Sequence, residues 1–165
     1  MNCYRPNLNV YVIWHPDADA VCQPLAKAIY TGLNRDHDKP FGRGIGIPTY
    51  FRCIAEPGKE IPLAIDLVTA VHTVMFVLVE DHFVYADPWG EYISELYTAT
   101  QTGDGQHLLV PVALTGSVFN LHPSISKANF VRLFNLEPAT VRDKLIHHVV
   151  HCLARLLESA ARPTE

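Results

Sequence analysis

The apolar positions of this chain fall into two patterns, short unbroken runs and longer stretches in which they recur every three or four residues. The clearest run covers residues 74–79, is rich in β-branched side chains and shows no alternation with polar residues. Such a run is typical of a strand that is buried on both faces, as in the centre of a parallel sheet. Two acids, Glu80 and Asp81, follow it. We therefore expect a central strand that ends at a polar edge.

Similar reasoning divides the rest of the chain into further strands and helices. Strands are predicted over residues 9–14, 47–53, 107–114 and 130–134, where β-branched and aromatic residues gather. Helices are predicted over residues 17–34, from 62 to the start of the central strand, 87–100 and 137–159, where apolar residues have helical spacing. Asp87 and Pro88 are expected to cap and start the third of these helices. Pro111 predicts a bulge or an edge position in its strand because it has no N–H to donate.

Strands and helices alternate, and the connections are long enough for crossovers. The chain is therefore predicted to be α/β, with helices on both faces of a parallel sheet. The simplest candidate is a flavodoxin-like three-layer sandwich with a five-stranded parallel sheet in the order 2-1-3-4-5. In that order the ligand crevice lies where the first and third strands end. Trp14 and His15 follow the first strand, and Glu80 follows the third.

The composition narrows the class of protein. The chain has 165 residues, of which 48% are hydrophobic, and this suits one globular domain over residues 1–165 with a core of about residues 8–158. The net charge of -4 gives no sign of a nucleic-acid or anionic-membrane partner. The longest apolar runs are far shorter than the ~20 residues that span a bilayer, and the first residues lack a signal-peptide pattern. The four cysteines form no C-x-x-C pair, so a reduced, cytoplasmic protein is expected.

The predicted helix after Pro88 carries the carboxylates of greatest interest. At about 100° per residue, Trp89 and Tyr92 fall on its apolar side. Glu91 lies nearly opposite Trp89 and is expected to face solvent, whereas Glu95 lies at the border of the apolar side, next to Tyr92. Glu95 is therefore the carboxylate better placed to enter a half-buried cleft. The plainer alternative is an ordinary border glutamate on an amphipathic helix.

Other polar residues carry weaker signals. Arg43, Arg52 and Lys59 lie in or beside predicted loops, where they could contact a phosphate group or simply be solvated. His147 and His151 have the i,i+4 spacing of metal ligands, but no H-E-x-x-H pattern or nearby acidic ligand completes the set. The last helix buries its opposite side, so we predict a solvated histidine face and no metal site.

Four segments of the chain, taken in order, resemble those of bacterial TIR (Toll/interleukin-1 receptor) domains. VYVIWHPDADAV resembles the opening strand with its following acid, and YFRCIAEPGKEIPLAIDLVTAV resembles the second strand, the BB loop with its proline-glycine turn and the next helix. HTVMFVLVEDHFV resembles the third strand, and PWGEYISELYTA resembles the tryptophan-then-acidic-leucine motif that opens the following helix. The resemblance covers about residues 8–158, nearly the whole chain.

By this resemblance the chain is an effector domain of bacterial anti-phage defence that cleaves the nicotinamide–ribose bond of NAD+, by hydrolysis or by cyclisation. Glu95 takes the place of the family's glutamate, which binds the ribose hydroxyls beside that bond. The family usually places this glutamate four residues after the tryptophan, whereas Trp89 and Glu95 are six apart and position 93 is Ile93. NAD+ is the substrate, and no separate cofactor is expected. The residues expected to contact it, with the tryptophans stacking on nicotinamide, are Trp14, His15, Arg43, Arg52, Lys59, Glu80, Trp89 and Tyr92.

Loop 56–61, from Glu56 to Ile61, would by the same resemblance contact a neighbouring protomer, and assembly would complete the site. A sensor domain or a partner protein would supply the activating signal. The main alternative is a non-catalytic TIR module that works by self-association through this loop. A third hypothesis is an unrelated flavodoxin-like receiver domain with Asp81 as phosphate acceptor, although Trp14 and His15 stand where a receiver carries an acidic pair.

Overall fold

The computed structural model describes residues 4–34, 38, 45–103 and 105–161, so the predicted contact residue Arg43 lies outside the described part. Five parallel strands form one sheet in the order β2-β1-β3-β4-β5. The strands are β1 (Leu8–Ile13), β2 (Thr49–Arg52), β3 (His72–Val79), β4 (His107–Ala113) and β5 (Val131–Arg132). The predicted α/β, flavodoxin-like fold with a 2-1-3-4-5 strand order is confirmed.

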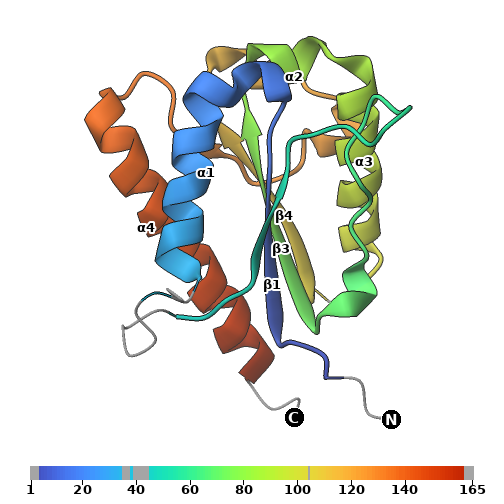
Figure 1. Ribbon diagram of the computed structural model, residues 1–165, viewed down its shortest axis with the longest axis vertical. Coiled ribbons are helices and arrows are strands. Elements are labelled where there is room, and N and C mark those ends of the chain that lie inside the picture. The colour runs from blue at the N-terminus through green and yellow to red at the C-terminus, as the bar shows by residue number, and fades with distance from the viewer. Residues whose placement is uncertain (1–3, 35–37, 39–44, 104, 162–165) are drawn as a thin grey trace.

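Helices cover both faces of this sheet. The α-helices are α1 (Asp19–Leu33), α2 (Asp81–Tyr85), α3 (Asp87–Gln101) and α4 (Pro138–Ala161). Short 3-10 helices in the connections are η1 (Pro16–Ala18), η2 (Leu67–Thr69), η3 (Gly116–Asn120) and η4 (Pro123–Ile125). α1 and α4 pack side by side on one face, and α3 lies on the other (Figure 1). None of the helices in the described residues is long and apolar enough to cross a membrane.

The central strand β3 accounts for the unbroken apolar run in the sequence. It pairs with β1 on one side and with β4 on the other. Val74, Phe76 and Leu78 point into the core beneath α1 and α4, whereas Met75 and Val77 point into the core beneath α3. Because both faces are covered by helices, every position along the strand favours an apolar side chain. The carboxyl end of β3 therefore lies in the middle of the row formed by the carboxyl ends of the five parallel strands.

The helix predicted from residue 62 is wrong. Residues 54–71 contain only the single turn of η2, and Ala55 and Pro62 pair as an isolated antiparallel bridge. The side chain of Asp66 accepts the backbone N–H of Val68 at 2.9 Å, and such a local bond competes with helix propagation. Val68, within η2, is 72% exposed. The segment therefore runs as a loop past α3 instead of covering the sheet as a helix.

Pro111 lies in β4, which is an interior strand with an unbroken register against β3, so the predicted bulge or edge position is wrong for the strand as a whole. Leu114 donates its N–H to the carbonyl of Val79 at 2.9 Å, so even-numbered N–H groups of β4 face β3. The backbone at position 111 faces the side of β4 on which β5 lies. However, β5 pairs only with Val112 and Ala113. The missing N–H of Pro111 therefore points beyond the start of β5, where it costs no ladder bond.

Candidate functional site

The carboxyl end of β3 holds a hydrogen-bonded carboxylate and imidazole. Glu80 is buried, and its Oε1 accepts the backbone N–H of Phe83 at 3.1 Å, which caps the N-terminus of α2. Its Oε2 lies 2.8 Å from Nδ1 of His82. Because an ionised carboxylate can only accept, His82 donates from Nδ1; Nε2 is an acceptor in the neutral ring and a second donor in the protonated ring. The hydrogen bond and the charge of Glu80 together raise the pKa of His82.

His15, at the end of β1, lies beside this pair. Its Nδ1 accepts the backbone N–H of Asp17 at 3.2 Å, so the proton of the neutral ring is on Nε2. The rings of His15 and His82 are nearly parallel, with centroids 6.2 Å apart. The structure thus brings His15 and Glu80 together at the strand ends, where the strand order predicts the crevice.

The two predicted tryptophans are both buried and lie in different places. Trp89 is 3% exposed and contacts the rings of His15 at 5.1 Å and Phe83 at 5.6 Å. Trp14 is 1% exposed, and its Nε1 donates to Oδ1 of Asp19 at 2.5 Å. Both indoles are therefore enclosed by side chains of the core. Stacking of either ring on nicotinamide stays a prediction, and it would require the enclosing side chains to move away from the ring.

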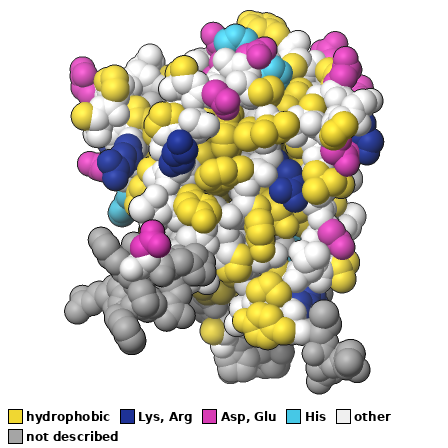
Figure 2. All heavy atoms as spheres, viewed as in Figure 1, with side chains coloured by type: hydrophobic (Ala, Val, Ile, Leu, Met, Phe, Trp, Pro, Cys, Tyr) yellow, Lys and Arg dark blue, Asp and Glu magenta, His cyan; other side chains and the backbone are white. Residues whose placement is uncertain are grey.

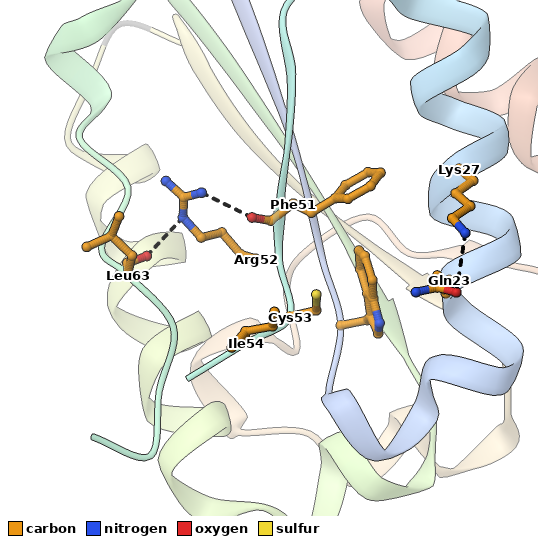
Figure 3. Close-up of a pocket in the computed structure, with 8 residues that line it drawn as sticks. Gln23, Lys27, Phe51, Arg52, Cys53, Ile54 and Leu63 are labelled. Carbon is orange, nitrogen blue, oxygen red and sulfur yellow. Dashed lines mark hydrogen bonds between the residues drawn. The ribbon is translucent and has the colours of Figure 1, made fainter. Parts of the chain in front are cut away.

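Arg52 belongs to a different part of the surface, beside the edge strand β2. It lines a hollow of about 360 Å³ together with Trp14, and hydrophobic side chains gather over this face (Figure 2). Figure 3 shows Phe51 pointing toward Lys27 of α1, whereas Arg52 points to the other side of the strand, toward Leu63. Arg52 donates from Nε to the carbonyl of Leu63 at 3.0 Å and from Nη1 to that of Phe51 at 3.1 Å. The bond to Leu63 ties the loop after β2 to the edge of the sheet.

The two glutamates of α3 line one shallow hollow of about 280 Å³ between α3 and loop 56–61. Lys59 and Tyr92 line the same hollow. Both glutamates are exposed, so the solvent-facing position predicted for Glu91 is confirmed, whereas the half-buried position expected for Glu95 is wrong. The reason is geometric: residues four apart on a helix differ by only about 40° in direction, and loop 56–61 lies against both.

Tyr92 anchors loop 54–71 to α3 at this hollow. Its hydroxyl donates to the carbonyl of Leu63 at 3.1 Å, and burial raises its pKa to about 12. The Leu63 carbonyl therefore accepts from both Tyr92 and Arg52. The two bonds hold the end of the loop against β2 and α3 at once.

Loop 56–61 is itself a closed turn. The N–H of Glu56 donates to Ile61 O at 3.0 Å, and the N–H of Lys59 donates to Glu56 O at 2.9 Å. Gly58 has a φ of 78°, a conformation that favours glycine. The side chain of Lys59 pairs with that of Glu56 at 2.5 Å, at the surface. The loop is thus a preformed, protruding turn with a charged pair on it.

A row of ring contacts joins the strand ends to the hollow. It runs from His82 to His15, Trp89 and Tyr92, with centroids 6.2, 5.1 and 6.5 Å apart. The predicted residues therefore occupy three places. His15 and Glu80 lie at the strand ends, Trp14 and Arg52 along β2, and Lys59, Tyr92 and Glu95 at the hollow. Sequence reasoning missed His82, although a glutamate and a histidine two residues apart after a buried strand are a usable signal.

Asp81 and the surface histidines are the remaining polar groups of interest. Asp81 accepts hydrogen bonds from Thr115 at 2.9 Å and Ser117 at 2.6 Å, and these bonds lower its pKa. His147 and His151 stack at 6.4 Å on the exposed side of α4. Within the part of the chain that the structure describes, no group of three or more His, Cys, Asp or Glu side chains could hold a metal ion.

Comparison with known proteins adds no assignment to this geometry. No family model matches the chain, and no curated protein matches it either. The function is therefore argued from the fold and from the residues of the site.

Proposed function

We propose that this chain is a TIR-type domain that cleaves the bond between nicotinamide and ribose in NAD+, with Glu95 as the carboxylate that binds the ribose. The observation that carries the proposal is the hollow between α3 and loop 56–61, which presents Glu91 and Glu95 beside Tyr92 and Lys59. A helix that follows the central strand of a 2-1-3-4-5 sheet supplies these carboxylates. The sequence resemblance gives them a substrate.

The reaction suits a carboxylate at this position. When the C1′–N bond breaks, its electron pair stays with the pyridinium nitrogen, so nicotinamide leaves as a neutral group and positive charge moves to the ribose. A carboxylate that accepts hydrogen bonds from the ribose hydroxyls stabilises this charge and orients the sugar. Water then attacks C1′ to give ADP-ribose, or an adenine nitrogen attacks to give a cyclic product, and in both cases one proton is released to solvent. In either case no strong general acid is needed for the leaving group.

The size of the hollow supports a site to which a second protomer contributes. Its volume of about 280 Å³ is at the lower limit of the roughly 300–1,000 Å³ of ordinary small-molecule pockets, and both glutamates are exposed. A dinucleotide bound there would remain largely in solvent. We therefore propose that a neighbouring protomer, contacted through loop 56–61, supplies the missing wall. An activating sensor domain or partner protein in bacterial anti-phage defence would act by promoting this assembly.

Self-association without catalysis is the second candidate. It is favoured by Ile93, which stands at the family's spacing from Trp89 and is buried in the core. The preformed turn of loop 56–61 would serve either function, since its backbone is closed by its own hydrogen bonds.

The deciding experiment follows nicotinamide release from NAD+ at high protein concentration. It compares wild type with Glu95→Gln, Glu91→Gln and Asp143→Asn, the last on the exposed side of α4. We expect release by wild type and Asp143→Asn, near-complete loss in Glu95→Gln and a smaller loss in Glu91→Gln. Equal release by Glu95→Gln and wild type would overturn the role of Glu95. No release by any of the proteins under assembling conditions would favour the scaffold function.

A further inference from the structure

A second hollow lies away from α3, between η3 and β5. Its volume of about 490 Å³ falls within the roughly 300–1,000 Å³ that small-molecule sites occupy. Its apolar wall includes Val118, Leu121 and Phe130, and Arg132 stands at its edge. Val118 is buried and Leu121 and Phe130 are half-buried, so the wall is part of the packed structure.

Arg132 is placed to meet an anion at this hollow. Its guanidinium lies 5.6 Å from the ring centroid of Phe119, which also lines the hollow and is 67% exposed. Phe119 is held edge-on against Phe134 at 6.2 Å. Among the ion pairs of the described residues, none includes Arg132. Stacking on a ring uses the face of a guanidinium and leaves the N–H groups at its edge free to bind a carboxylate in bidentate fashion.

The charge of the surrounding segment also favours an anion. Residues 105–136 contain no Asp or Glu, although the whole chain has a net charge of -4. The same segment contains Lys127 and Arg132. Asp81, from outside the segment, contacts it by accepting hydrogen bonds from the hydroxyls of Thr115 and Ser117. The segment that forms the hollow thus carries no acidic residue of its own to repel an anion at Arg132.

The segment that forms the hollow is anchored to the rest of the fold. Ser124 in η4 shares a hydrogen bond of 2.6 Å with Ser94 in α3. The N–H of Ala128 donates to the carbonyl of Ile125 at 2.9 Å, and the side chain of Ile125 is buried in the core. A hollow held in this way needs little ordering when a ligand binds, which lowers the entropic cost of binding.

We propose that this hollow binds a small organic anion with a flat apolar body, an aromatic carboxylate in chemical class. The body packs against Phe119 and the apolar wall, and the carboxylate accepts hydrogen bonds from Arg132. The site is separate from the hollow that holds Glu95, and its existence does not depend on NAD+ cleavage.

The test uses two probes with the same ring system, the anionic 2-naphthoate and the neutral 2-naphthalenemethanol, titrated into the protein and followed by NMR or calorimetry. We expect saturable binding of the carboxylate and at least about tenfold weaker binding of the alcohol, since a charge-assisted bond is lost. Arg132→Gln is expected to weaken 2-naphthoate binding by about tenfold or more, and Phe119→Ala to weaken both probes. Lys127→Gln is the matched control, because it removes a cation of the same segment that does not line the hollow.

Three results would each overturn the proposal. The first is an absence of saturable 2-naphthoate binding to wild type up to its solubility limit. The second is equal affinity for the carboxylate and the alcohol. The third is an unchanged affinity in Arg132→Gln while NMR spectra show that the variant is folded. Arg132→Lys keeps the charge but not the bidentate geometry, and it is expected to bind with intermediate affinity.

Discussion

The Nδ1 atom of His82 donates a hydrogen bond of 2.8 Å to the buried carboxylate of Glu80. We predict that the pKa of His82, measured by NMR titration of its ring, lies above the ordinary histidine value of about 6.5. Glu80→Gln removes the negative charge and is expected to bring the pKa of His82 back toward that value. Glu91→Gln is the control. It removes a charge at the hollow between α3 and loop 56–61 and should leave the His82 titration unchanged.

The same pair makes stability depend on pH in a defined direction. A pKa that is raised in the folded state means that folding favours protonated His82. This contribution is complete below the ordinary pKa of about 6.5 and is lost as the pH rises through the folded-state value. An identical His82 titration in wild type and Glu80→Gln would contradict this account.

Ile93 tests whether α3 could hold its glutamate at the family's usual spacing. The side chain is 1% exposed and packs in the core beneath α3. Ile93→Glu would bury an unpaired carboxylate, so we expect a loss of about 3 kcal/mol or more in the free energy of unfolding. Glu95→Ile, at an exposed position of the same helix, is the matched control and should change stability by about 0.5 kcal/mol or less. Urea denaturation measures both, and a fully stable Ile93→Glu protein would show that this position can face solvent.

The hydroxyl of Tyr92 tests the anchoring of loop 54–71. Tyr92→Phe removes the donor to Leu63 O, and we expect a loss of about 1 kcal/mol in the free energy of unfolding. Hydrogen exchange should also become faster at the amides of this loop. Tyr85→Phe is the control, because Tyr85 is exposed. Equal stability and exchange in Tyr92→Phe and wild type would mean that the Tyr92 hydroxyl does not anchor the loop.

The strand order was predictable from the sequence because both faces of β3 are buried. In a chain that alternates strands and helices, an unbroken apolar run such as Val74 to Val79 is typical of the central strand of a parallel sheet. The helix predicted after Pro62 was wrong because local interactions, and not the spacing of apolar residues, determine the backbone there. Its apolar residues had helical spacing, but hydrogen bonds made by Asp66 and the bridge of Ala55 to Pro62 decided the local backbone. Spacing along the sequence does not reveal such local competition.

The site was less predictable than the fold. The helical wheel of α3 correctly placed Tyr92 on the buried side, but the direction of Glu95 relative to the rest of the protein depended on where loop 56–61 lies. The burial of Trp14 and Trp89 likewise depends on contacts with residues from other elements. These are tertiary relationships, and one helix considered alone does not contain them.

The central claim is that Glu95 takes part in NAD+ cleavage at a site completed by a second protomer. The most direct measurement is the initial rate of nicotinamide release per mole of protein, recorded over a wide range of protein concentrations. We predict that this specific rate rises with concentration in wild type and remains near zero in Glu95→Gln at every concentration. A specific rate that is independent of protein concentration would contradict completion of the site by assembly, and equal rates in the two proteins would contradict the role of Glu95.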